Sequence, residues 1–236
     1  MKKKFIFCMM FVLSWNAVVS QTKPSSNNSN NKNNMEKLNL NEFTENNPKN
    51  TAGKMMTKGD TIKTLIKDDR YFVKERVKNS AFSMVRSYDT SSLAICTEVM
   101  LFYGFCTGIG KSYDEKGDVI EEEDYDKDYP FSVEMLIDKC KKEYGIDLSV
   151  DMDDFDYMRA KYLSDPNAYN PYSDGYRFVR RYFYIDKYVY DVGISLTPGP
   201  ICALRRAILI DGSTGEVISD ETGPPAYPPG PTGGPK

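Results

Sequence analysis

The sequence predicts an α+β fold in which one antiparallel sheet, of about five to seven strands, carries two or three helices packed on one face. Three observations support this class. Some segments repeat apolar residues at helical spacing, others alternate β-branched and aromatic residues, and Gly, Asp or Pro clusters separate them. About 160 residues lie between Thr61 and Glu221, a length that suits a single core. We therefore expect one α+β domain over residues 59–222.

Both flanks of this domain have compositions that do not favour a core. Residues 1–20 contain three early lysines, an apolar run and small residues before Gln21, which is typical of a cleaved signal peptide. Residues 21–58 are predicted to be a disordered linker, because 21–50 contain eleven asparagines and few large apolar residues. Residues 223–236 form a Pro- and Gly-rich tail that is predicted to be disordered.

The first regular element is expected to be a helix from Asp60 or Thr61 to about Asn79. Its apolar face would consist of Ile62, Leu65, Ile66, Phe72, Val73 and Val77. The run LAICTEVMLFYGFCTGIG that follows is rich in β-branched and aromatic residues and in glycine, so it is predicted to be strand. Asp114 to Gly117 then supplies turn residues between two alternating flanks, which predicts a hairpin.

The clearest helix of the sequence begins after Ser132, which is a good N-cap, and ends at Gly145, which is typical of a left-handed C-terminal residue. Its buried face would contain Val133, Leu136, Ile137, Cys140 and Tyr144. A second helix is predicted from Asp151 to Leu163, followed by a loop at 165–175. The segments RFVRRYFYIDKYVYDVGISL and RRAILIDGSTGEVISDE are predicted to be sheet, with a turn at 211–215.

Two short stretches resemble known families. The run around Gly110, Tyr113, Asp114, Gly117 and Ile120 resembles a single MORN-type unit, a hairpin found in exported bacterial proteins of uncharacterised function. The segments KKEYGIDL, YVYDVGISL and IDGSTGEVI together resemble a PepSY-like module. That second resemblance implies a non-catalytic α+β module of the cell envelope, in some cases one that restrains proteases.

The composition narrows the chemistry that the chain can perform. It contains no histidine, which excludes Ser-His-Asp and Cys-His catalysis, HExxH zinc sites and histidine general bases. We predict no catalytic residues, no metal and no cofactor. Cys96, Cys106, Cys140 and Cys202 could form two disulfides in an oxidising compartment, although Cys140 also suits a buried position on its helix.

Charge argues against nucleic acid and anionic lipid as partners. Removal of residues 1–20 would take away three lysines and no acid, which changes the formal net charge from −3 to −6. The acidic run at 121–128 places Asp124, Asp126 and Asp128 at EF-hand spacing, but Tyr129 and Met135 occupy the positions of the required Gly and Glu. A solvated strand end explains the run better, and no spacing selects a glycosidase pair of carboxylates.

Tyrosine and arginine gather between residues 169 and 190, and these are residue types that dominate protein interfaces. Half-buried strand tyrosines are the simpler explanation of the pattern. The candidate binding residues are Tyr169, Tyr172, Tyr176, Arg180 and Arg181.

The function expected from these features is that of an exported, non-catalytic binding protein. It would act in the periplasm or outside the cell on another envelope or secreted protein, for example as an inhibitor or immunity protein. No transmembrane segment is expected after signal cleavage. The alternatives are a carboxylate-dependent hydrolase of envelope polysaccharide and a structural protein of the cell surface.

Overall fold

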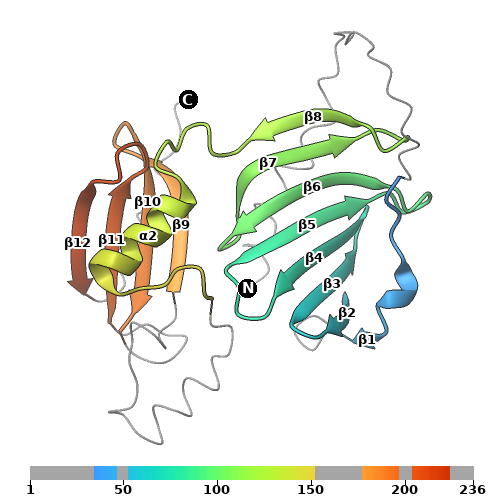
Figure 1. Cartoon of the computed structure of the whole chain (residues 1–236), viewed down its shortest axis with the longest axis horizontal. Coiled ribbons are helices and arrows are strands. Elements are labelled where there is room, and N and C mark those ends of the chain that lie inside the picture. Colours follow the sequence, from blue (N-terminus) through green and yellow to red (C-terminus); the bar gives the residue numbers. More distant parts are fainter. Residues whose placement is uncertain (1–34, 47–52, 152–176, 197–203, 224–236) are drawn as a thin grey trace, which may run out of the picture.

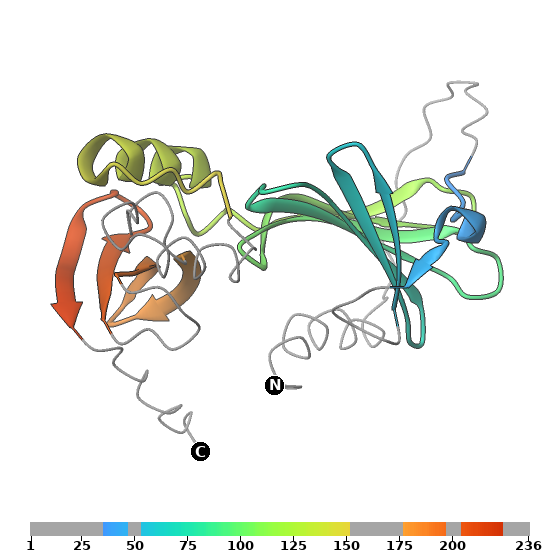
Figure 2. The same ribbon diagram turned by 90° about the horizontal axis from the view of Figure 1, so that it is seen from below.

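The described part of the chain folds into two antiparallel sheets joined by one α-helix. The computed structural model describes residues 35–46, 53–151, 177–196 and 204–223. Figure 1 shows the larger sheet, β1 to β8, beside the smaller sheet, β9 to β12, with α2 lying on the smaller one. The view in Figure 2 shows the two sheets side by side rather than stacked on one another, and along the chain the segment after β8 leads from the first sheet to α2.

The first sheet has the strand order β1-β2-β3-β4-β5-β6-β7-β8, so every neighbouring pair is consecutive in sequence. Its strands are β1 (Glu45–Asn46), β2 (Gly53–Lys58), β3 (Thr61–Lys67), β4 (Tyr71–Val77), β5 (Phe82–Tyr88), β6 (Ile95–Phe102), β7 (Phe105–Tyr113) and β8 (Val119–Asp124). The predicted hairpin at Asp114–Gly117 is confirmed as the turn between β7 and β8.

The second sheet has the order β12-β11-β10-β9, again a simple meander. Its strands are β9 (Arg177–Tyr184), β10 (Lys187–Ser195), β11 (Arg205–Asp211) and β12 (Val217–Gly223). The predicted turn at 211–215 is confirmed between β11 and β12, where Asp211 Oδ1 accepts hydrogen bonds from the Ser213 and Thr214 amides.

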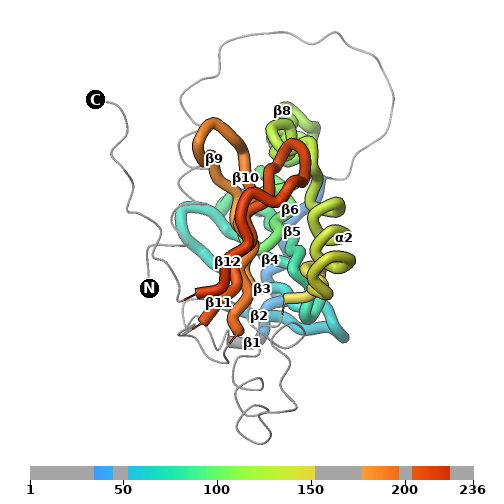
Figure 3. The backbone as a smooth tube through the Cα atoms, turned by 90° about the vertical axis from the view of Figure 1, so that its left-hand side faces the viewer, coloured from blue at the N-terminus to red at the C-terminus, as the bar shows by residue number. Residues whose placement is uncertain are grey.

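Helix α2 (Val133–Tyr144) confirms the clearest helix prediction. The Ser132 hydroxyl accepts the Met135 amide at 3.3 Å, and Gly145 adopts φ 68° at the C-terminal end. Val133, Leu136 and Cys140 form its buried face. Figure 3 shows α2 along one side of the smaller sheet.

The predicted α+β class is wrong, because the described residues form two sheets with one α-helix rather than one sheet with two or three helices. Residues predicted as the first helix form β3 and β4 instead. Thr61, Ile62, Thr64 and Ile66 favour strand, and Leu65 pairs with Val73 across the hairpin, where both are buried. The predicted helix from 151 to 163 lies outside the described residues, apart from Asp151.

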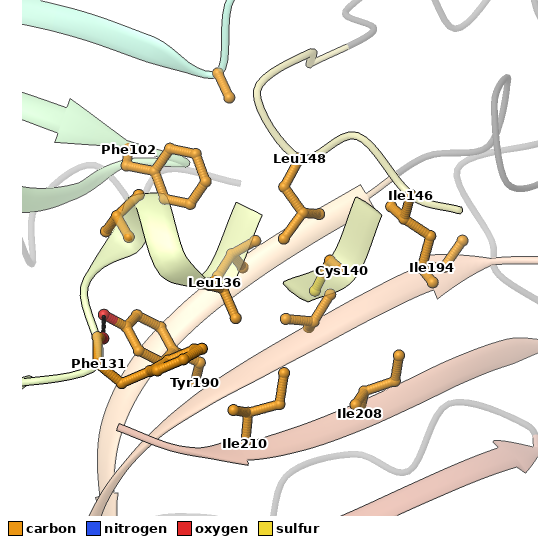
Figure 4. Close-up of a cluster of buried hydrophobic side chains, with 14 of the residues drawn as sticks. Phe102, Phe131, Leu136, Cys140, Ile146, Leu148, Tyr190, Ile194, Ile208 and Ile210 are labelled. Carbon is orange, nitrogen blue, oxygen red and sulfur yellow. Dashed lines mark hydrogen bonds between the residues drawn. The ribbon is translucent and has the colours of Figure 1, made fainter. Parts of the chain in front are cut away.

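Two hydrophobic clusters hold this arrangement together. The larger lies between α2 and the second sheet, with Tyr190, Leu136, Ile208 and Ile210 at its centre, and Phe102 joins it from the first sheet. Figure 4 shows these side chains and the hydrogen bond of 2.8 Å that the Tyr190 hydroxyl donates to the Phe131 carbonyl. The two sheets therefore share a core.

The second cluster shows that part of the segment expected as a linker belongs to the fold. Leu38 and Phe43, two of its few large apolar residues, are buried against the first sheet with Leu65, Val73, Tyr88 and Ile95. Residues 40–42 form the short 3-10 helix η2 (Leu40–Glu42). A few well-placed apolar side chains therefore order a segment whose average composition is polar.

Cys96 and Cys140 are free thiols, and Cys202 lies outside the described residues. Burial raises the pKa of the Cys140 thiol to about 12. Within the described ranges, no helix combines the length and apolar character needed to cross a membrane.

Candidate binding surface

The hairpin of β9 and β10 ends in a two-residue turn formed by Ile185 and Asp186. Tyr184 pairs with Lys187, so only these two residues connect the strands. Their φ angles are 43° and 63°, which correspond to the left-handed region and to a type I′ turn. Asn-Gly is the usual sequence for such a turn, and a β-branched residue at positive φ is a rare outlier.

Large apolar and aromatic side chains surround this turn and remain open to solvent. We call the following five residues the hairpin tip. The exposed fractions are 38% for Tyr182, 61% for Phe183, 43% for Tyr184, 74% for Ile185 and 37% for Tyr188. A cluster of this kind on one projecting element is typical of a surface that contacts another molecule.

Strand alternation sends neighbouring residues of β9 to opposite sides of the sheet. Arg177, Val179 and Arg181 lie on the side of the shared core, where Val179 is buried. Phe178, Arg180 and Tyr182 lie on the opposite side. The predicted pair Arg180 and Arg181 is therefore divided between the two sides.

Arg181 forms the polar centre of the contact between the two sheets, and its side chain is only 7% exposed. Its guanidinium pairs with Asp126 at 2.5 Å and donates to the Tyr190 hydroxyl at 2.9 Å. Further bonds run to the Tyr125 carbonyl at 3.3 Å and the Cys106 carbonyl at 3.5 Å. Both terminal nitrogens are thus engaged within the chain, whereas Nε is buried without a hydrogen-bond partner among the described residues.

Three aromatic rings enclose the same guanidinium. Its carbon lies 4.2 Å from the ring centre of Tyr129, 4.7 Å from that of Phe105 and 5.1 Å from that of Tyr190. Because these contacts are desolvated, the cation–π attraction is strong. Arg181 connects β7, the segment after β8, and the second sheet.

Arg180 has the opposite character, because it is exposed on the other side of β9. Its guanidinium carbon lies 4.6 Å from the centre of the Phe178 ring. Asp191 stands opposite Arg180 in the register of β10. Burial raises the pKa of Asp191, while Arg180 and Arg205 act to lower it. This side of the hairpin therefore combines an exposed cation with a partly desolvated acid.

A series of ring contacts connects the hairpin tip with the core. Phe183 packs on Tyr188 at 5.1 Å, Tyr188 on Tyr129 at 5.4 Å, and Tyr129 on Tyr190 at 5.2 Å between ring centres. Burial raises the pKa of Tyr129 to about 12. The tip is consequently supported from below by packed rings.

An ion pair and a backbone contact fix the base of the hairpin. Lys187 pairs with Asp211 at 2.7 Å, and the Gly212 amide donates to the Tyr188 carbonyl at 2.8 Å. A Cβ at position 212 would lie 2.7 Å from the Tyr129 ring, so glycine permits the close approach. The turn between β11 and β12 therefore braces β10.

The sequence analysis placed the binding surface in the region of the β9–β10 hairpin but identified only part of the residues that are exposed there. Among the predicted residues, Tyr169, Tyr172 and Tyr176 lie outside the described residues, Arg180 is exposed, and Arg181 is buried. Phe183 and Ile185, the most exposed of the tip, were not singled out. Their alternation with polar residues resembled that of ordinary strand, and the Ile-Asp turn carries no glycine or asparagine to reveal it.

Two of the acidic residues considered for chemistry, Asp124 and Asp126, are engaged in the fold. Asp126 accepts from the Thr107 hydroxyl and the Gly108 amide in addition to its ion pair with Arg181. Asp124 Oδ1 accepts a hydrogen bond of 2.9 Å from the Asp126 amide. Within the ranges that the structure describes, no three His, Cys, Asp or Glu side chains are placed to hold a metal ion.

A second charged cluster lies on the first sheet, centred on Arg86. Its guanidinium pairs with Glu98 at 2.7 Å and with Glu75 at 3.2 Å, and Lys63 pairs with Glu75 at 3.3 Å. These carboxylates are thus bound by cations on neighbouring strands. We interpret the cluster as cross-strand stabilisation of the sheet.

Comparison with known proteins gave no match for this chain among family models, curated proteins or solved structures.

Proposed function

We propose that the protein is an exported, non-catalytic binding protein that recognises another envelope or secreted protein through the hairpin tip. The observation that carries the proposal is the gathering of five exposed large apolar residues on one two-residue hairpin. Aromatic residues on a rigid support lose little entropy on binding and supply much contact area. The resemblance to PepSY-like modules points the same way, because it implies a non-catalytic module.

An inhibitor or immunity role is the specific form that we propose. A projecting hairpin suits insertion into a cleft of an enzyme or toxin, because the cleft can then contact both sides and the end of the turn. This role is favoured over the rival carboxylate-dependent hydrolase, which needs a pair of carboxyl groups that flank one bond. Asp126, Glu75 and Glu98 are held in ion pairs, and Asp191, whose pKa is raised by burial, lies opposite Arg180.

The test is affinity capture with the chain from Gln21 to Lys236 against envelope and secreted fractions of the producing organism. The wild type is compared with Phe183→Ser/Tyr184→Ser at the tip. Val119→Ser/Ile120→Ser serves as the matched control, because these residues of β8 are 47% and 65% exposed and distant in sequence from the tip. We expect one stoichiometric protein to be retained by the wild type and the control but lost by the tip variant.

Two results would contradict the proposal. Equal retention by the tip variant would show that the partner binds elsewhere, and a wild type that captures no protein would remove the protein-binding function. In the second case, digestion of peptidoglycan and other envelope glycans by the purified chain would test the hydrolase.

A further inference from the structure

The turn at Ile185 and Asp186 carries a residue choice that folding does not explain. Both residues have positive φ, and Ile185 is β-branched, so its left-handed conformation is sterically unfavourable. Asn-Gly would form the same type I′ turn without this strain. The Ile185 side chain is also 74% exposed, so little packing within the chain offsets the strain. Strained residues that persist in this way cluster at functional sites.

The Asp186 carboxylate in the turn is also accessible to a partner. Lys187, the nearest cation in sequence, is held by Asp211 at 2.7 Å. Asp186 is exposed, and among the ion pairs of the described residues it has none. The end of the hairpin thus combines an exposed apolar group with an adjacent carboxylate whose charge is not neutralised there.

The tip is organised before any partner arrives. Phe183 and Tyr188 meet edge to face across the hairpin at 5.1 Å between ring centres, and Tyr182 and Tyr184 do so at 6.3 Å on the other side. Tyr188 in turn packs on Tyr129 at the rim of the core. Ile185 therefore projects from a rigid aromatic base, which lowers the entropy cost of binding.

We propose that Ile185 is the anchor residue of this surface and inserts into a concave apolar pocket of a partner protein, whose rim presents a basic group to Asp186. This inference rests on the proposed function and specifies its partner. A protruding, convex turn requires a concave site, and the carboxylate beside the anchor requires a cation.

A lipid bilayer fits the same turn less well. Insertion of Ile185 would carry the adjacent Asp186 carboxylate toward the hydrocarbon region, which is unfavourable. The full chain also has a formal net charge of −3, so anionic lipid surfaces would repel it.

The decisive variant is Ile185→Asn/Asp186→Gly in the chain from Gln21 to Lys236. It introduces the preferred type I′ sequence, so we expect the melting temperature to rise by several degrees. The probe is the protein captured by the wild type, purified and titrated by calorimetry. We expect its affinity to fall by at least about 30-fold, as truncation of an interface anchor requires. If the turn only connects the two strands, the double variant will be more stable than the wild type and will bind the captured protein with unchanged affinity.

Two further variants separate the apolar and the charged parts. Ile185→Asn alone should reproduce most of the affinity loss, and it replaces the double variant if that chain does not fold. Asp186→Asn should weaken binding and reduce its dependence on salt, because it removes the charge that pairs with the rim. Unchanged affinity and salt dependence in both variants would overturn the inference.

The location of the contact is tested by placing a photoreactive benzoylphenylalanine at position 185. We expect cross-links to an apolar cavity of the captured protein. Cross-links to a second copy of the chain, or sedimentation with vesicles of phosphatidylcholine and phosphatidylglycerol at 4:1, would overturn the inference. Loss of binding in Phe183→Ser/Tyr184→Ser but not in Ile185→Asn would refute the anchor and retain the proposed function. Failure of the wild type to capture any protein would refute both.

Discussion

Replacement of Arg181 by leucine tests whether one buried cation holds the two sheets together. The change removes the ion pair with Asp126, the bond to Tyr190 and three cation–π contacts. It also leaves Asp126 in the contact without its cation. Removal of one partner from a fully buried pair costs about 3–5 kcal/mol, and the 28% exposure of Asp126 reduces the expected cost to roughly 3 kcal/mol or less. We expect a loss of this size in the free energy of unfolding, measured by urea denaturation.

The adjacent residue supplies the control. Arg180→Leu changes the same residue type in the same strand, but its guanidinium is exposed and packs on the Phe178 ring. An exposed cation–π contact contributes about 0.5–1 kcal/mol, and Arg205 still acts on Asp191 after the change, so the loss should stay well below that of Arg181→Leu. The difference between the two losses in the free energy of unfolding then measures what burial and ion pairing of Arg181 contribute.

Two outcomes would refute this reasoning. Equal and small losses in both variants would mean that the Arg181 contacts add little to the junction. A loss in Arg181→Leu that persists undiminished after the further change Asp126→Asn would show that the unpaired carboxylate is not its cause. Asparagine removes the charge but keeps an oxygen that can accept from Thr107 and Gly108, so removal of both charges should recover part of the stability.

Two further predictions concern other contacts. Hydrogen bonds from the Lys141 side chain and, to a lesser extent, the Ser149 side chain lower the pKa of Asp147 from its ordinary 3.8 to about 2. The stabilisation by ionised Asp147 is therefore present above pH 3.8 and is lost as the pH falls to about 2. Asp147→Asn should flatten this part of a curve of melting temperature against pH. Gly193→Ala should destabilise the chain by about 1–3 kcal/mol, because the new Cβ would lie 2.0 Å from the Phe178 ring. Gly223→Ala, where nothing lies within 4 Å, should be nearly neutral in the same thermal unfolding assay.

The sequence predicted elements whose ends carry their own chemical signals. Ser132 and Gly145 mark both ends of α2, and Gly117 marks the turn of β7 and β8, so local rules sufficed there. The stretch from 60 to 79 failed for a different reason. Its apolar residues fit a helical period, but pairing with adjacent strands decides its structure, and a single periodic pattern does not contain that information.

The candidate surface shows the same limit more sharply. The aromatic content around 182–190 indicated an interface, but it did not show that the chain reverses at Ile185 and Asp186. Local propensity argues against a turn at these residues, and tertiary contacts at Tyr188 and Gly212 impose it. Nor could sequence separate Arg180 from Arg181, since the side of a strand that meets the core depends on register. Disagreement between local rules and structure is expected at functional sites.

The consecutive strand order of the first sheet has a consequence for how the chain acquires its structure. Each strand from β1 to β8 pairs only with the strands next to it in sequence, so every step closes a short loop. We expect this sheet to assemble hairpin by hairpin, with each new strand adding to the one before it in sequence. The Arg181 contact joins positions 55 residues apart and forms only after β9 exists. We therefore expect the two halves to close late in folding, and their contact to couple the unfolding of one sheet to that of the other.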